Sequence, residues 1–220
     1  MIIAIDGPSA SGKSTTAKGI SKKLGIMHLD TGAMYRAVTL GLKKTGISLE
    51  DEVSIQKFLV QADISFGDEN RIFLNGSDVS REIRSADISS RVSAVSALPI
   101  IREAMVRIQR KIAENTDCVL EGRDIGTIVF PNADFKFFLI ADMEVRAKRR
   151  LLELEAMGET TTLSELINDI EKRDRLDSSR DHSPLIQAED AILIDTSGIT
   201  IDDQINKIVK IITKGKVKEK

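Results

Sequence analysis

The stretch that decides the fold lies near the start of the chain and reads Ile2-Ile3-Ala4-Ile5-Asp6-Gly7-Pro8-Ser9-Ala10-Ser11-Gly12-Lys13-Ser14. Residues 2–5 form an uninterrupted apolar run, as expected for a parallel strand buried on both faces. Residues 7–14 match the pattern G-x-x-x-x-G-K-[ST], and a helix to about residue 24 is expected after them. A glycine-rich loop between a buried strand and a helix is typical of phosphate binding, because backbone N–H groups at the helix N-terminus face the anion.

The side chains of this loop have separate expected tasks. Lys13 is expected to bridge the β- and γ-phosphates of a nucleoside triphosphate, and the Ser14 hydroxyl to bind Mg²⁺. The full nucleotide-binding set of the loop is Gly7, Pro8, Ser9, Ala10, Ser11, Gly12, Lys13, Ser14 and Thr15. The loop does not say what becomes of the nucleotide. A GTPase is disfavoured, because residues 206–209 lack the aspartate of an Asn-Lys-x-Asp base-reading motif.

Strands and helices alternate along the rest of the chain. Apolar runs predict further strands at residues 27–29, 118–121, 133–140 and 191–194. Helices are expected at residues 32–45, 51–61, 85–97, 99–114, 143–157 after an Asp142 cap, and from a capping box at 162–165 to about 180, with a last amphipathic helix before a frayed tail at 214–220. This alternation predicts an α/β fold of the three-layer P-loop NTPase class, with a central parallel sheet and helices on both faces.

Residues 63–79 depart from this alternation of strands and helices. Short strands are expected at 63–66 and 71–75, and Asn75-Gly76 is a strong tight-turn signal. We expect a small antiparallel insert here, with an irregular surface loop as the alternative.

Composition excludes several classes of protein. With 41% hydrophobic and 30% charged residues, the chain is ordinary for a globular protein, and its net charge of -2 gives no general attraction to nucleic acid or to an anionic membrane. No apolar run approaches a membrane span, and the apolar start meets Asp6 too soon for a signal peptide, so a cytoplasmic location is expected. The single cysteine, Cys118, is expected in the core.

Four clusters of arginine and carboxylate residues stand out. Asp30, Thr31 and Arg36 follow a short strand and open a helix, where Thr31 and the helix N-terminus can hold a phosphate. Arg123 and Asp124 follow a buried strand, at the edge of the sheet where ligands bind. Arg123 and Asp124 pairing only with each other is the alternative.

The other two clusters lie on predicted helices. Arg173, Asp177 and Arg180 share one helix face, and so do Arg146, Arg149 and Arg150. For both clusters, a solvated helix with internal salt bridges is the alternative. Two roles are open for Glu121, a carboxylate near Mg²⁺ or an N-cap.

No catalytic base is evident in the sequence. His28 and His182 are interpreted as structural or solvated residues. A phosphate monoester is ionised near neutral pH, so its phosphorylation would need only alignment and cations to neutralise charge.

Four motifs in this order resemble the bacterial type of cytidylate kinase, within the P-loop nucleoside monophosphate kinases. They are residues 5–14, Leu29-Asp30-Thr31-Gly32-Ala33-Met34-Tyr35-Arg36, Glu121-Gly122-Arg123-Asp124-Ile125-Gly126-Thr127, and Arg173-Asp174-Arg175-x-Asp177-Ser178-x-Arg180. The resemblance runs to about residue 212. It implies direct in-line transfer from ATP, with Mg²⁺, to CMP or dCMP. It also implies one domain of residues 1–220, with an acceptor-binding insert at about 31–98 and a short lid at about 151–165.

The resemblance also implies the role of each site residue. Thr31, Arg36, Arg123 and Arg180 would hold the acceptor phosphate, with Asp30 beside them; Arg173 and Asp177 would contact the ribose; Ser93, Arg102 and Asp124 would read cytosine; and Arg149 would join the ATP site. Lys13, Arg123 and Arg180 would be the catalytic residues, in a chain expected to be a monomer. Kinases for AMP, UMP or shikimate, and a nucleotide-binding switch without transfer, are the alternatives.

Overall fold

The structure is a computed structural model that describes residues 1–67, 71–156 and 158–218. Its backbone contacts divide the chain into two compact units. Unit 1 comprises Met1–His28 and Thr116–Lys220, and unit 2 comprises Leu29–Asn115.

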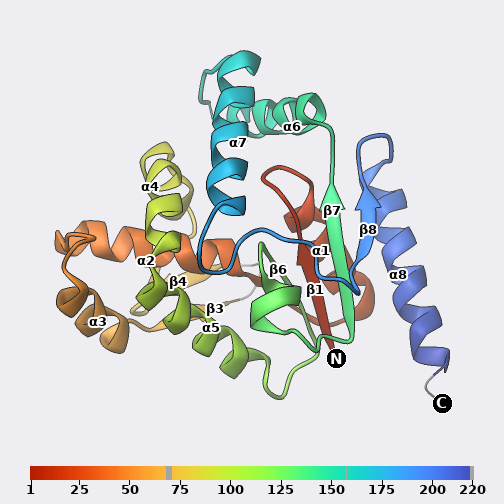
Figure 1. Ribbon diagram of the computed structural model, residues 1–220, viewed down its shortest axis with the longest axis horizontal. Helices are drawn as coiled ribbons and strands as arrows, with labels where there is room; N and C mark the ends of the chain where they lie inside the picture. The colour runs from red at the N-terminus through yellow and green to blue at the C-terminus, as the bar shows by residue number, and fades with distance from the viewer. Residues whose placement is uncertain (68–70, 157, 219–220) are drawn as a thin grey trace. The chain divides into compact units, whose positions relative to one another are not determined.

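A five-stranded sheet carries unit 1 (Figure 1). Its order is β2 (Met27–Asp30), β6 (Cys118–Gly122), β1 (Ile2–Asp6), β7 (Phe135–Ile140) and β8 (Ile192–Asp195). β1 pairs in parallel with β6 and β7, and β7 pairs in parallel with β8. The central parallel sheet predicted from the sequence is therefore confirmed. Its register sets Ile5 opposite Glu121, so the ends of β1 and β6 meet at one edge.

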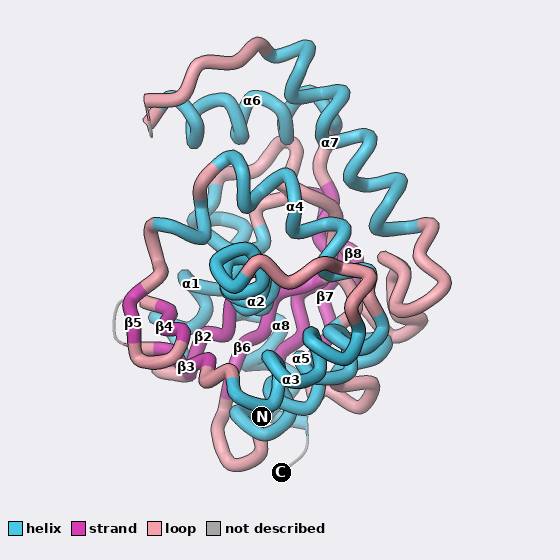
Figure 2. The backbone as a smooth tube through the Cα atoms, turned by 90° about the vertical axis from the view of Figure 1, so that its left-hand side faces the viewer, coloured by secondary structure: helices cyan, strands magenta, loops and turns pink. Residues whose placement is uncertain are grey.

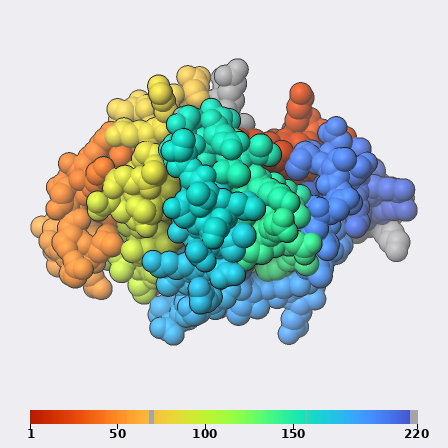
Figure 3. Space-filling view, turned by 90° about the horizontal axis from the view of Figure 1, so that it is seen from above, coloured from red at the N-terminus to blue at the C-terminus, as the bar shows by residue number. Residues whose placement is uncertain are grey.

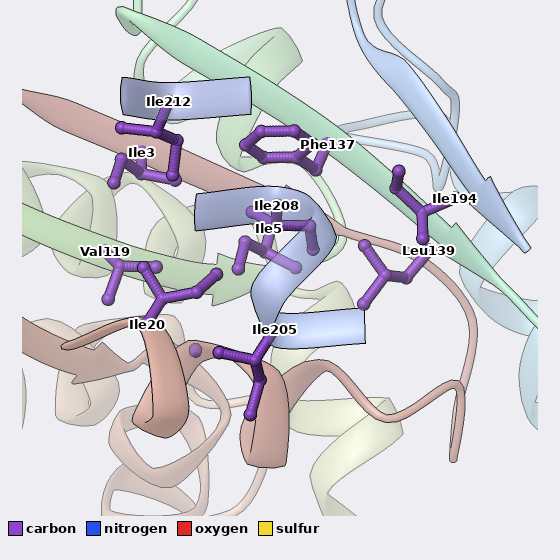
Figure 4. Close-up of a cluster of buried hydrophobic side chains, with 11 residues drawn as sticks. Ile3, Ile5, Ile20, Val119, Phe137, Leu139, Ile194, Ile205, Ile208 and Ile212 are labelled. Carbon is purple, nitrogen blue, oxygen red and sulfur yellow. The ribbon is translucent and has the colours of Figure 1, made fainter. Parts of the chain in front are cut away.

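Two helices cover one face of this sheet. α1 (Lys13–Leu24) packs against α8 (Ile201–Lys218), and both bury apolar side chains against β1 and β7. Figure 4 shows Ile208 of α8 beside Ile5 of the sheet, and Ile205 of α8 beside Ile20 of α1. α8 continues to Lys218, into the tail expected to fray from residue 214, and the last two residues of that tail lie outside the described residues. Cys118 is buried as expected, and burial raises the pKa of its thiol to about 11.

A helical pair follows the carboxyl end of β7. α6 (Met143–Glu155) and α7 (Leu163–Ser178) pack on each other through Ala147, Leu166 and Ile170. Figures 1 and 2 both show this pair beyond the end of β7, and in Figure 3 it stands nearest the viewer. The capping box of Thr162 and Glu165 is confirmed, whereas Asp142 precedes α6 without a side-chain cap bond. The expected end of α6 at Met157 lies outside the described residues.

Unit 2 contains four helices and a small sheet among its described residues. These are α2 (Thr31–Thr45), α3 (Glu52–Gln61), α4 (Ala86–Ala97) and α5 (Pro99–Ala113), with β3 (Ile64–Phe66), β4 (Ile72–Leu74) and β5 (Ser77–Asp78). The three strands are antiparallel, so the predicted insert is confirmed. Asn75 and Gly76 make the turn with φ of 52° and 77°, the left-handed geometry that such tight hairpins require. Nowhere in the described ranges is a helix long and apolar enough to cross a membrane.

Candidate active site

The glycine-rich loop follows a path that side chains would obstruct. Gly7 has φ of 148°, and a Cβ atom there would lie 2.1 Å from the backbone oxygen of Leu139. Gly12 caps α1 in a left-handed conformation, and its carbonyl accepts the first helical N–H bond from Thr16 at 3.0 Å. The loop therefore lies against β7 and delivers the N-terminus of α1 to the carboxyl edge of the sheet, where an anion can bind.

Lys13 is the buried cation of this loop. Its Nζ donates to the carbonyl of Pro8 at 2.5 Å. Burial lowers the pKa of Lys13 well below 10.5, and the positive charges of Arg123 and Arg173 lower it further. The charges of two arginines thus act on Lys13 here, and a bound polyphosphate would offset that repulsion.

Ser14 begins a chain of three side chains. Its hydroxyl donates to Glu121 Oε2 at 2.5 Å, and His28 Nε2 lies 3.0 Å from Glu121 Oε1. Burial alone would raise the pKa of Glu121, but the hydrogen bond and charge of His28, with smaller effects of Ser14 and Lys13, hold it below its usual value. Glu121 is therefore an ionised carboxylate next to the predicted Mg²⁺ ligand. The N-cap alternative is wrong, since Glu121 lies within β6.

Asp177 joins two of the predicted acceptor-binding arginines. Its carboxylate accepts from Arg123 Nε at 2.7 Å and from the guanidinium of Arg180. Burial would raise the pKa of Asp177, but Arg123 and Arg180 hold it below 3.8. Arg123 thus pairs with Asp177 and not with the neighbouring Asp124, while Arg173 on the same helix adds its charge to both Asp177 and Lys13.

Asp6 supports the turn that carries Arg123 and Asp124. Its two carboxylate oxygens accept from the backbone N–H groups of Ile125 at 2.9 Å and Gly126 at 2.7 Å. These residues begin a short π-helix, Ile125–Val129, which the sequence did not predict. Burial raises the pKa of Asp6 to about 6 in spite of the two N–H bonds. Sequence analysis gave Asp6 no role, although a carboxylate that ends a buried strand is a signal for one.

Arg146 and Asp174 form a clasp on the glycine-rich loop. Arg146 Nη1 donates to the carbonyl of Ser9 at 3.1 Å and to Asp174. Asp174 Oδ1 in turn accepts the N–H of Ser9 at 3.1 Å. The backbone N–H and C=O groups of Ser9 are therefore both held by the α6–α7 pair. The sequence motif that contains Asp174 did not indicate this role.

The other two arginines of α6 behave differently from Arg146. Arg149 donates to the hydroxyl and carbonyl oxygens of Thr196 at 3.0 and 2.7 Å, and its Nη1 lies 3.6 Å from where a Gly12 Cβ would be. Arg150 makes an internal pair with Glu153 at 3.0 Å. Of the three arginines predicted on one helix face, Arg146 and Arg149 therefore reach the loop, whereas Arg150 fits the salt-bridge alternative.

The remaining predicted residues lie in unit 2. Asp30 caps α2 by accepting the N–H of Ala33 at 2.9 Å, and Thr31 is the buried first residue of that helix. The guanidinium of Arg36 folds back to 3.6 Å from where a Gly32 Cβ would be. Thr31 and Arg36 are thus brought to the N-terminus of α2, as the sequence predicted.

Ser93 and Arg102 are both hydrogen-bonded to Ser96, in the last turn of α4. Arg102 is 4% exposed, its Nη1 donates to the carbonyl of Ser96 at 3.0 Å, and its guanidinium carbon lies 5.4 Å from the ring centroid of Tyr35. The Ser96 hydroxyl donates to the carbonyl of Ser93 at 3.2 Å. The Asp124 side chain is 4% exposed at the end of β6 in unit 1.

The donor set around Ser14 fits Mg²⁺. A hydroxyl oxygen and a nearby carboxylate are the hard oxygen ligands and supporting groups that this ion prefers. Among the described residues, no three His, Cys, Asp or Glu side chains gather as a metal site. Mg²⁺ does not need such a group, because it retains water and takes phosphate oxygens from its nucleotide.

Comparison with solved structures shows the fold. An uncharacterized protein from Eubacterium ventriosum has a TM-score of 0.55 at 17% identity, over 97% of this chain and 98% of that chain. The shikimate kinase from Bacteroides thetaiotaomicron has a TM-score of 0.51 at 12% identity, over 97% and 98%. At such identities the likeness concerns the architecture alone.

Comparison of sequences shows the family. A family model described as cytidylate kinase matches residues 3–214. The cytidylate kinase of Caldanaerobacter subterraneus subsp. tengcongensis is 50% identical over 218 residues, which are 98% of this chain and 97% of the relative. That of Leuconostoc mesenteroides is 49% identical over 213 residues, 96% and 95% of the two chains. This chain therefore belongs to the cytidylate kinase family.

Proposed function

We propose that this protein transfers the γ-phosphoryl group of ATP to CMP and dCMP, giving CDP or dCDP and ADP. Relatives named cytidylate kinase, aligned over nearly the whole chain, support the acceptor. The single observation that carries the chemistry is the cationic group around the glycine-rich loop, where the positive charges of Arg123 and Arg173 lower the pKa of buried Lys13.

Four carboxylates near this group already have hydrogen-bond donors. Asp6 accepts two backbone N–H groups, Glu121 holds Ser14 and His28, Asp174 holds Ser9 and Arg146, and Asp177 holds two arginines. The two that bind arginine, Asp174 and Asp177, are weak bases because their charge is already stabilised, and this favours a phosphate acceptor over an alcohol. The attacking oxygen of CMP needs no such base, since a phosphate monoester is ionised near neutral pH.

On the donor side, the residues of this chain bind and orient the triphosphate. Lys13 and the loop of residues 7–15 would bind its phosphates, through backbone N–H groups other than those of Pro8, which has none, and Ser9, which donates to Asp174. Arg149 would lie beside them from α6. Mg²⁺, held through Ser14, would neutralise charge on the phosphate oxygens when bound. The Arg146–Asp174 clasp would steady Ser9 while the lid, at about residues 151–165, excludes water.

On the acceptor side, we propose the roles that the family resemblance implies. Thr31, Arg36, Arg123 and Arg180 would bind the phosphate of CMP, with Asp30 fixing the start of α2. Arg173 and Asp177 would contact the ribose. Ser93, Arg102 and Asp124 would bind cytosine, whose N4 amino group donates and whose N3 and O2 accept. Uracil reverses the polarity at positions 3 and 4, so it would leave buried groups mispaired.

Release of ADP from ATP and Mg²⁺, measured against CMP, dCMP, UMP, AMP and shikimate, tests the activity. We expect turnover to be highest with CMP and dCMP. Lys13→Ala should lower kcat about 100-fold or more, as loss of a preorganised charge does. Lys18→Ala, an exposed position on the same helix, is the control and should change little. Equal turnover by Lys13→Ala and Lys18→Ala would refute the site.

Base recognition has its own test. Asp124→Ala should narrow the preference for CMP over UMP by roughly 5- to 150-fold, the equivalent of about 1–3 kcal/mol for a buried polar group left without its partner. Asp169→Ala, an exposed carboxylate on α7, should leave the preference unchanged. An unaltered ratio in the Asp124 variant would remove that residue from the cytosine site.

The role of Asp177 can be divided between ribose and arginine contacts. Asp177→Asn should raise KM for CMP more than for dCMP if the carboxylate binds the 2′-hydroxyl. An equal rise for both would mean that Asp177 acts by holding Arg123 and Arg180. An unchanged KM for both acceptors would contradict either role. We also propose a single cytoplasmic kinase domain that is a monomer, which sedimentation velocity would check.

A further inference from the structure

The proposed activity gives no task to His28, a buried titratable side chain beside Glu121. His28 lies in β2 and is the last residue of the first segment of unit 1. Its side chain is 3% exposed, and its Nε2 lies 3.0 Å from Glu121 Oε1. The other oxygen of Glu121 accepts the hydroxyl proton of Ser14 at 2.5 Å. One carboxylate therefore links a core histidine to the side chain that we propose as the Mg²⁺ ligand.

The direction of the Ser14 proton decides whether its hydroxyl can bind a cation. A serine hydroxyl has one proton and two lone pairs, and only a lone pair can face a metal ion. Ser14 Oγ donates its one proton to Glu121 Oε2 at 2.5 Å, which leaves the lone pairs of Ser14 Oγ available. The orientation of the Glu121 carboxylate thus controls the ligand.

His28 controls that orientation. Glu121 lies opposite Ile5 in the register of β1 and β6, which fixes its backbone but leaves its terminal torsion broad. A donor on Oε1 fixes the carboxylate plane and assigns Oε2 to Ser14. In this contact Glu121 Oε1 is the acceptor, which requires a proton on Nε2 of His28.

We propose that His28 is a positioning residue for the kinase reaction: through Glu121, it holds the Ser14 hydroxyl with its lone pairs turned toward Mg²⁺. This inference rests on the Mg²⁺ role proposed for Ser14. A plain packing role for His28 would affect stability and nucleotide binding with and without the metal alike, whereas a positioning role affects the metal-dependent part of binding.

Two variants with the same chemical group and different reach separate these roles. In His28→Gln the amide nitrogen takes the place of Nε2 and can donate to Glu121. In His28→Asn the same amide is one methylene shorter and cannot reach. The chain has two histidines, and His182 lies in an exposed loop, so His182→Asn is the matched control.

Calorimetric titration with ADP, in excess Mg²⁺ and in EDTA, gives the gain in affinity that the metal provides. We expect His28→Asn to reduce this gain about 10-fold while leaving affinity in EDTA unchanged, as loss of a group supporting a metal ligand does. His28→Gln and His182→Asn should retain the wild-type gain. An undiminished gain in His28→Asn, or an equal loss with and without Mg²⁺, would overturn the inference.

Ser14→Ala separates failure of the inference from failure of its basis. If the metal-dependent gain survives in Ser14→Ala, the proposed Mg²⁺ ligand is wrong, whatever the His28 variants do. Should His28→Asn fail to fold, the tautomer of His28 in the wild-type protein decides, read from long-range proton–nitrogen NMR spectra. A neutral ring protonated on Nδ1 would overturn the inference, and one protonated on Nε2 would support it.

Discussion

Replacing Gly7 by alanine should lower the free energy of unfolding more than a glycine-to-alanine replacement at an uncrowded position does. The new Cβ would lie 2.1 Å from the backbone oxygen of Leu139, about 1 Å closer than carbon and oxygen tolerate. The obstacle is backbone in a buried strand, so it cannot swing aside as a side chain would. The backbone conformation, with φ of 148°, adds a cost of about 1–3 kcal/mol for a residue with Cβ.

The strain of overpacking contributes roughly a further 1–3 kcal/mol, so Gly7→Ala should lose about 2–6 kcal/mol of unfolding free energy. Gly25→Ala is the matched control, because Gly25 also has positive φ, at 65°, but no atom lies within 4 Å of its added Cβ. It should lose only about 1–2 kcal/mol.

Urea denaturation followed by circular dichroism suits this comparison, because the chain has no tryptophan and one tyrosine for fluorescence. ADP affinity should fall with Gly7→Ala and not with Gly25→Ala, since only the first moves the loop. If Gly7→Ala loses no more unfolding free energy than Gly25→Ala, the close approach of loop and β7 is not a constraint.

Three further substitutions test other parts of the molecule. The pKa of Asp6 is raised from 3.8 to about 6, so the folded state binds the proton of Asp6 more tightly than the unfolded state does. The unfolding free energy of the wild type, relative to that of Asp6→Asn, should therefore fall by up to about 3 kcal/mol as pH rises from 4 to 7 in urea titrations. A difference that stays constant or rises with pH would contradict this. Asp174→Ala removes a charged acceptor from the Ser9 N–H, so kcat/KM for ATP should fall roughly 10- to 150-fold. If Asp174 only pairs with Arg146, the variant should lose unfolding free energy but keep the wild-type kcat/KM. Ile208→Ala should cost about 2–5 kcal/mol in urea, against under about 0.5 kcal/mol for exposed Lys210→Ala, and similar losses would remove α8 from the core.

Local patterns predicted most of the fold. The loop, the parallel sheet, the antiparallel insert and the capping box at Thr162 are each encoded within a few neighbouring residues, and all are confirmed. The family resemblance is confirmed by relatives that are 50% and 49% identical in sequence. The roles of individual acceptor-binding residues and the division into one domain with insert and lid stay predictions.

Contacts between distant segments could not be predicted in the same way. Asp6 binds a backbone N–H 119 residues away, Asp174 one 165 residues away, and His28 contacts a carboxylate 93 residues away. No periodicity or motif records such partners, because they depend on which strands become neighbours. The same reason explains why the separate partners of the α6 arginines were not predicted: helical spacing gives a common face, but the neighbouring segments decide what each arginine contacts.

The crowding of positive charge around Lys13 has a practical consequence for handling the protein. A site that holds mutually repelling cations gains stability from any multivalent anion that enters it, in proportion to the logarithm of anion concentration over its dissociation constant. Sulfate, phosphate or pyrophosphate carried through purification will therefore raise the melting temperature and compete with nucleotides. Affinities measured in phosphate buffer will be weaker than those measured in a zwitterionic buffer at equal ionic strength.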